Sequence, residues 1–209
     1  YQPKVSVATG EILGAEALIR WQTGTGLVFP GDFIPLAEET GLIIPIGRWC
    51  LEEGCRQLKV WHQTDKYLNL SVNLSARQFS DSKFMDSVEQ IVAQSGVDTQ
   101  YITLELTESL LMDKLEEKLL LLKKLKQIGF KLSIDDFGTG YSSLSYLRQL
   151  PVDELKIDRS FIMETTKHED SRAIVATIVF LAKQLKLLTV AEGIEELEEL
   201  EFVRQLNCD

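Results

Sequence analysis

The chain has few of the residues that usually build thiol or transition-metal sites. Among its 209 residues are only two histidines and three cysteines. The odd set Cys50, Cys55 and Cys208 lacks the spacing of a zinc site and does not suggest a disulfide framework. We therefore expect reduced thiols in a cytoplasmic protein.

Positive charge and long apolar segments are also scarce. The chain has 22 Lys and Arg residues against 32 Asp and Glu residues, a formal net charge of −10. This balance argues against binding a nucleic-acid polymer through a basic surface, but bound divalent cations would still permit a phosphorylated ligand. No apolar run reaches the roughly 18 residues of a membrane span, and the first residues do not resemble a signal peptide. We expect no membrane contact from this segment.

Strand and helix patterns alternate from about Leu68 onward. Apolar spacing predicts amphipathic helices over residues 81–95, 115–128, 170–185 and 195–206, with short β-branched runs between them. Gly129 is expected just after the second of these helices, in the C′ position. This βαβ rhythm indicates an α/β domain with a parallel sheet or barrel.

The first third of the chain follows a different pattern. Strands starting near Lys4 and spanning Leu13–Trp21, with a turn at Gly10 between them, predict an antiparallel hairpin. A short helix is expected from Pro30, with Asp32 as its N-cap, followed by a long helix over residues 45–62. A barrel built on this chain would therefore begin irregularly.

Five expected strands end in an acidic, amide or amine side chain. The strands span residues 70–73, 102–105, 131–136, 152–158 and 187–192, and the polar residues at their ends are Asn73, Glu105, Asp135, Asp136, Lys156, Asp158 and Glu192. In a parallel barrel the carboxyl ends of all strands meet at one edge, where such barrels carry their active sites. Carboxylate and amide oxygens suit hard cations such as Mg²⁺ or Mn²⁺. The pattern favours a cation site that acts on an oxygen-rich substrate such as a phosphate ester.

Several of these residues also have simpler explanations. Asp135 and Asp136 resemble helix caps, although the following Gly-Thr-Gly indicates a tight loop close to a ligand. Lys156 could be an edge lysine, or a buried amine paired with acids and holding a water molecule. Glu105 and Glu108 could be exposed carboxylates or first-turn helix charges, and Asn73 could be a turn residue.

Three further acids are less clearly placed. Glu16 lies in the middle of an apolar strand and needs a partner, either a cation or Arg20. Glu192 precedes a glycine and suits a metal ligand or a base. Glu195 belongs to a Glu-rich helix start, which favours a solvated position, but it could also reach the same edge of the barrel.

The chain resembles the EAL domain family, the bacterial cyclic di-GMP phosphodiesterases. The resemblance begins with Glu16-Ala-Leu18 and Arg20-Trp21 and extends over essentially the whole chain. It continues through the segments 30–41, 72–79, 104–109, 135–143, 155–161 and 190–193. It implies a modified TIM (β/α)8 barrel with one antiparallel strand near the N-terminus.

The resemblance also implies roles for individual residues. One Mg²⁺ or Mn²⁺ would be held by Glu16, Asn73, Glu105 and Asp135, and a second ion by Asp136. Lys156 would hold the nucleophilic water, Glu192 would act as ligand or base, and Glu108 would brace the loop from Phe137 to Ser143. The substrate contacts would be Gln2, Leu18, Arg20, Asp158 and Glu195. A metal-bound hydroxide would attack one phosphodiester of cyclic di-GMP in line and open the ring to linear pGpG.

The main alternative is a catalytically inactive receptor that binds cyclic di-GMP. We expect the hydrolase, because Glu16, the paired aspartates and the loop glycines are all present. The resemblance further implies a homodimer through this domain and fusion to sensory or GGDEF domains in a parent protein, which could itself be anchored to a membrane. We expect residues 1–209 to form one EAL domain that begins inside its first strand and stops before its last strand and helix.

Overall fold

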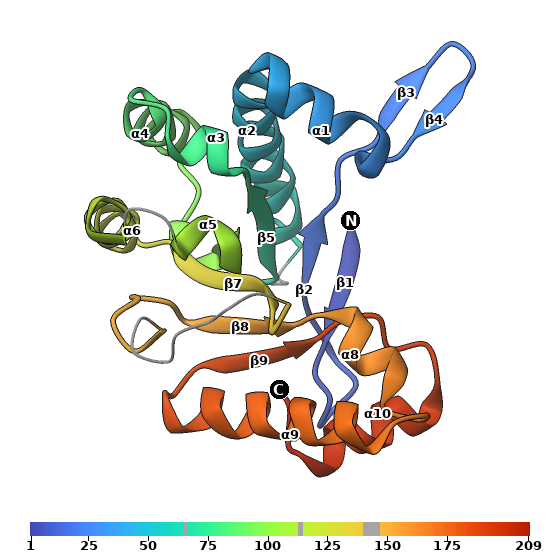
Figure 1. Ribbon diagram of the computed structural model, residues 1–209. Helices are drawn as coiled ribbons and strands as arrows, with labels where there is room; N and C mark the ends of the chain where they lie inside the picture. The colour runs from blue at the N-terminus through green and yellow to red at the C-terminus, as the bar shows by residue number, and fades with distance from the viewer. Residues whose placement is uncertain (65–66, 113–114, 140–146) are drawn as a thin grey trace. The chain divides into compact units, whose positions relative to one another are not determined.

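The computed structural model describes residues 1–64, 67–112, 115–139 and 147–209 (Figure 1). Its strands are β1 (Gln2–Val5), β2 (Ile12–Ala17), β3 (Trp21–Thr23), β4 (Gly26–Val28), β5 (Asn69–Leu74), β6 (Ile102–Thr107), β7 (Lys131–Phe137), β8 (Glu154–Ile157) and β9 (Leu188–Ala191). Its α-helices are α1 (Pro30–Thr40), α2 (Ile43–His62), α3 (Ala76–Phe79), α4 (Phe84–Ser95), α5 (Glu108–Met112), α6 (Leu115–Ile128), α8 (Arg159–Glu164), α9 (Glu169–Gln184) and α10 (Leu197–Gln205). A 3-10 turn, η1, covers Thr99–Tyr101.

The main sheet has the strand order β1-β2-β5-β6-β7-β8-β9, and β3 pairs only with β4. Parallel pairing joins β2 to β5, β7 to β8, and β8 to β9. These features confirm the predicted α/β class. None of the described helices is long and apolar enough to cross a membrane.

The chain forms two compact units. The first contains residues 1–4, 12–104 and 128–130, and the second contains residues 5–11, 105–127 and 131–209. Strand β6 begins in the first unit and ends in the second.

In the first unit, helix α2 packs closely on strand β5. The contact depends on Gly54, because a Cβ atom there would lie 2.9 Å from a methyl carbon of Leu70 and 3.4 Å from one of Val72. Leu58 and Cys55, on the same helix, are fully buried. This packing fixes the strand that carries Asn73 at its carboxyl end.

The predicted N-terminal hairpin is present. Strands β1 and β2 are neighbours in the sheet, and their connection is closed by hydrogen bonds from Gly10 N–H to Ser6 O and from Ser6 N–H to Glu11 O, both 2.8 Å. The predicted strand Leu13–Trp21 was too long, because β2 ends at Ala17 and Trp21 begins β3.

The segment after β2 forms a second hairpin that the sequence pattern did not predict. Strands β3 and β4 are antiparallel, and the Thr23 hydroxyl donates to Gly26 O at 2.8 Å across their turn. Asp32 was predicted to be the N-cap of α1. This prediction is wrong, because the helix already begins at Pro30 and Phe29 is its N-cap. Proline suits the first helical position, since it has no N–H to leave unbonded there.

In the second unit, helix α9 lies along β8 and β9 (Figure 1). Buried side chains such as Leu155, Ile157, Val175 and Val179, each at most 1% exposed, form part of its core. The four predicted amphipathic helices are α4, α6, α9 and α10, with ends shifted by up to three residues. Gly129 has φ 110°, as its predicted position after α6 requires.

The three cysteines are free thiols. Burial raises the pKa of both Cys50 and Cys55 to about 11, and it also raises the pKa of Cys208. Because the thiolate is the reactive form, burial lowers the reactivity of these side chains at neutral pH.

Candidate active site

Lys156 is a buried amine surrounded by carboxylates from three other segments of the second unit. Its Nζ lies 2.7 Å from Glu105 Oε2, 3.0 Å from Asp135 Oδ1 and 2.6 Å from Glu192 Oε1. Lys156 and Glu105 are each only 1% exposed. A charge this deeply buried is tolerable only when paired, which accounts for three acids around one ammonium group.

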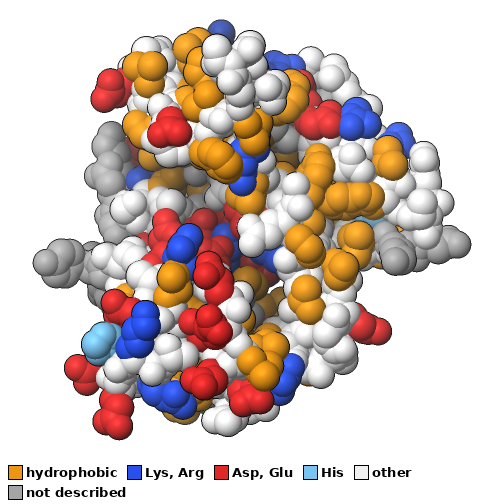
Figure 2. Space-filling model, turned by 90° about the vertical axis from the view of Figure 1, so that its right-hand side faces the viewer, with side chains coloured by type: hydrophobic (Ala, Val, Ile, Leu, Met, Phe, Trp, Pro, Cys, Tyr) orange, Lys and Arg blue, Asp and Glu red, His pale blue; other side chains and the backbone are white. Residues whose placement is uncertain are grey.

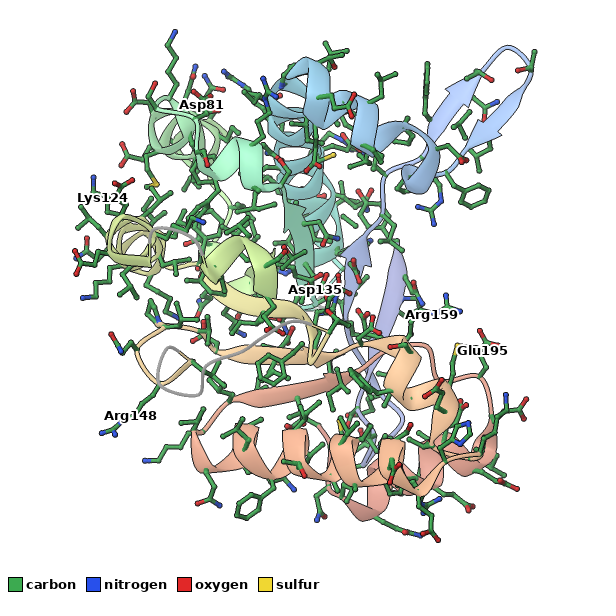
Figure 3. The ribbon with its side chains drawn as sticks, viewed as in Figure 1. Asp81, Lys124, Asp135, Arg148, Arg159 and Glu195 are labelled. Carbon is green, nitrogen blue, oxygen red and sulfur yellow. The ribbon has the colours of Figure 1, made fainter. Side chains whose placement is uncertain are left out.

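A β-bulge places both aspartates of the Asp-Asp pair opposite this lysine. Strands β7 and β8 pair at Ile134–Leu155 and again at Phe137–Ile157, with a register shift between. Over that interval β7 has two residues, Asp135 and Asp136, whereas β8 has only Lys156. Bulges re-aim side chains and are common beside active sites. Figure 3 labels Asp135 at the carboxyl end of β7.

Asp136 occupies the strained position of the bulge. Its φ of 53° is left-handed, a region that Asp and Asn tolerate better than most residues. Its N–H donates to Asp135 Oδ1 at 3.0 Å. Partial burial raises the pKa of the Asp136 carboxyl, and the charges of Asp135 and Asp158 raise it further. The ionised form of Asp136 is therefore less favourable than that of an ordinary aspartate, and a nearby cation would offset this cost.

This raised pKa predicts that Asp136→Asn stabilises the metal-free protein. Between the ordinary and the raised pKa, the folded state binds more protons than the unfolded state, so stability falls as pH rises through this window. Asn removes the charge and still accepts the left-handed backbone. In EDTA at pH 7 the variant should melt a few degrees higher than the wild type, and the gain should shrink as pH approaches 4. Exposed Asp86→Asn is the control for melting by calorimetry, and a gain that is independent of pH would contradict this explanation.

Glu108 ties helix α5 to the segment that follows β7. This residue is 3% exposed, and its Oε2 accepts a hydrogen bond from Gly138 N–H at 3.0 Å. Gly138 has φ 102°, and a Cβ atom there would lie 2.9 Å from the Phe161 ring. A larger residue at position 138 would clash with the Phe161 ring and move this segment away from Glu108. The part of the expected loop from Gly140 to Ser143 lies outside the described residues.

In the first unit, Glu16 and Asn73 form a pair on neighbouring strands. Asn73 Nδ2 donates to Glu16 Oε1 at 2.7 Å, from β5 to β2. The parallel register, in which Glu16 faces Ser71, brings these two side chains to the same end of the strand pair. The acid in the middle of an apolar strand thus has an amide partner.

Three of the expected substrate contacts also gather in the first unit. Gln2, Leu18 and Arg20 line one hollow of about 320 Å³, together with Tyr1 and Pro3. The Arg20 Nη1 donates to Ile19 O at 2.8 Å. A hollow with one guanidinium group and one amide suits an anionic, partly planar ligand.

The remaining expected contacts lie at helix starts in the second unit. Asp158 is the N-cap of α8 and accepts hydrogen bonds from the Ser160 N–H, at 2.9 Å, and from the Ser160 hydroxyl. The N–H groups of Glu195 and Glu196 both donate to Glu199 Oε2, at 2.9 and 3.0 Å. Glu199 is 3% exposed and orders this turn, but we did not predict it. The capping-box spacing of Glu196 and Glu199 was the available signal.

The second unit offers a set of oxygen donors that suits a cation. Oxygen atoms of Asp135, Asp136 and Glu192 all lie within 4.8 Å of one another. Such carboxylates match Mg²⁺ or Mn²⁺ better than softer metals. Acidic side chains, in red, are also prominent on the face shown in Figure 2, with Lys and Arg side chains among them.

Comparison with protein families gives one match over the whole chain. The model of the EAL domain matches residues 1–209. The bifunctional diguanylate cyclase/cyclic di-GMP phosphodiesterase MucR of Pseudomonas aeruginosa is 46% identical over all of this chain and 31% of its own length. The cyclic di-GMP phosphodiesterase NbdA of the same species is 41% identical over all of this chain and 27% of its own length. The chain thus spans about a third or less of these relatives.

A solved structure gives the same result for the fold. The structure described as PaMucR phosphodiesterase in complex with c-di-GMP superposes with a TM-score of 0.97 at 46% identity. The superposition covers 100% of this chain and 85% of that one. This similarity confirms the predicted barrel-type α/β fold.

Proposed function

The chain belongs to the EAL domain family, and on that premise we propose that it hydrolyses cyclic di-GMP to linear pGpG with the help of divalent cations. The observation that supports this most strongly is the arrangement around Lys156, where a β-bulge and two neighbouring strands direct carboxylates at one buried ammonium group. A site whose only function was to bind a dinucleotide would not need so many acids beside an anionic ligand.

Mg²⁺ or Mn²⁺ fits the donors that these residues supply. We propose that Glu16, Asn73, Glu105 and Asp135 hold one ion and that Asp136 contributes to a second. When bound, such ions acidify water and neutralise charge on a phosphodiester. The cluster in the second unit supports this assignment, because it directs the carboxylates of Glu105, Asp135 and Glu192 at one place.

The protein's own groups have separate tasks in this proposal. Glu105 and Glu192 hold Lys156 in place. The N–H that now points at Asp135 becomes free to donate to the attacking water and orient it when Asp135 binds a cation instead. Glu192 is the group that accepts the proton, as the most exposed of the three acids that contact Lys156, with 25% of its side chain accessible. Glu108 acts indirectly, by holding the segment at Gly138 in place.

Substrate binding uses a different set of side chains. We propose that Arg20 pairs with a phosphate of the dinucleotide, because a guanidinium group can donate two parallel hydrogen bonds to its oxygens. Gln2 and Leu18 line the same hollow. We propose that Asp158 and Glu195 are further substrate contacts.

The proposal predicts metal-dependent turnover. Incubation with cyclic di-GMP and Mg²⁺ or Mn²⁺ should give pGpG on chromatography, and EDTA should abolish the product. Ca²⁺ should support turnover poorly, because it is larger and less strict in its geometry. Binding of cyclic di-GMP without any pGpG in either Mg²⁺ or Mn²⁺ would instead identify the protein as a receptor.

A further inference from the structure

The Arg20 side chain is held from two sides within the first unit. Its Nη1 donates to the backbone oxygen of Ile19, and its guanidinium carbon lies 5.1 Å from the centre of the Phe29 ring. A cation this close to an aromatic ring is attracted to the electron-rich face of that ring. Arg20 also lines the hollow with Gln2 and Leu18. The same arginine therefore lies over the Phe29 ring and at the hollow.

Phe29 itself has no role in the core. The side chain is 55% exposed, although a phenylalanine of this size is usually buried. Its backbone is fixed, because it is the N-cap of α1 in an extended conformation and precedes Pro30. An edge contact between the rings of Trp21 and Phe33, 5.8 Å apart, also ties β3 to α1 on either side of Phe29. The exposed ring is therefore presented in a defined place.

We propose that Phe29 is a positioning residue for the substrate, which holds the Arg20 guanidinium at the hollow before the dinucleotide arrives. A free arginine loses much rotational freedom when it binds a phosphate, and an arginine already resting on a ring loses less. This inference depends on the proposed function only in that Arg20 must contact cyclic di-GMP. It predicts a contribution to affinity and none to the chemical step.

Affinity measurements on conservative variants test this role. Phe29→Leu keeps an apolar side chain but removes the ring, and it should raise the Kd for cyclic di-GMP by about two- to five-fold in titration calorimetry with Ca²⁺. Phe29→Tyr keeps the ring and should bind like the wild type. Leu27→Ala is the matched control, since Leu27 is 50% exposed on the neighbouring strand β4 and should not alter Kd.

A double-mutant cycle separates action through Arg20 from direct contact. Arg20→Ala alone should weaken binding about ten-fold or more, and adding Phe29→Leu to it should cause no further loss. An unchanged Kd in Phe29→Leu, or an equal loss with and without Arg20, would overturn the inference. If the wild type binds cyclic di-GMP with the expected cycle but forms no pGpG, the positioning role stands and the hydrolase proposal fails. If the wild type does not bind cyclic di-GMP at all, both fail.

Discussion

Lys156→Met should lower the rate of cyclic di-GMP hydrolysis by about 10²- to 10⁴-fold while leaving cyclic di-GMP bound. Methionine has nearly the length of lysine but cannot donate a hydrogen bond to the attacking water. It also leaves the carboxylates of Glu105, Asp135 and Glu192 without the ammonium group that they now share. In EDTA the variant should therefore lose on the order of 3 kcal/mol of unfolding free energy, and it should gain more from added Mn²⁺ than the wild type does.

Lys126→Met provides the matched control for this variant. Lys126 Nζ pairs with Asp153, at 2.6 and 2.7 Å, in the same unit but on helix α6 and away from the four-residue cluster. This control should keep its rate within about two-fold of the wild type, because the half-buried pair of Lys126 and Asp153 is not part of the cluster around Lys156. If Lys156→Met loses binding and keeps turnover, Lys156 is a substrate clamp and not the residue that orients water.

Asp135→Ala and Glu16→Ala should each abolish measurable turnover without unfolding the protein. Each removes a proposed metal ligand, and the loss of a ligand removes the cation and the activated water together. Asp135→Ala removes one carboxylate partner of Lys156 but leaves the other two, and it relieves repulsion with Asp136, so its metal-free form should melt close to the wild type. The rate is measured by pGpG formation, and Mn²⁺ binding by electron paramagnetic resonance gives a readout that does not depend on activity.

Glu201→Ala, an exposed acid on α10, is the control for these two variants and should behave as the wild type. Glu108→Ala should differ from them, since it should lower the rate through the segment at Gly138 and change Mn²⁺ affinity much less. A rate near that of the wild type in either Asp135→Ala or Glu16→Ala would remove these residues from the metal site.

The predictable part of the fold is the part governed by local periodicity. The helices α6 and α9 follow from apolar spacing, and the five strands that end in polar residues were placed to within two residues at their starts. The hairpin of β3 and β4 was missed because Trp21 continues an apolar run, and only residues 18–20 separate β3 from β2. The start of α1 at Pro30 was predicted correctly, but its N-cap was wrongly assigned to Asp32, because a proline at the first helical position outweighs an aspartate two residues later.

The candidate site was predictable in its residues but not in its geometry. Acids at strand ends are visible in the sequence, whereas the bulge that turns both Asp135 and Asp136 toward Lys156 depends on pairing with a distant strand. The same holds for Phe29, whose contact with Arg20 requires the β3–β4 hairpin to bring residues nine positions apart together. Long-range pairing of this kind leaves no local pattern in the chain.

The most direct test of the account is mass spectrometry of the product formed from cyclic di-GMP in ¹⁸O-labelled water with Mn²⁺. In-line attack of water at phosphorus should give pGpG that carries one labelled oxygen in its 5′-phosphate for each bond broken, and EDTA should abolish its formation. The absence of pGpG, or label in the 3′-hydroxyl group in place of the phosphate, would contradict the proposed hydrolysis.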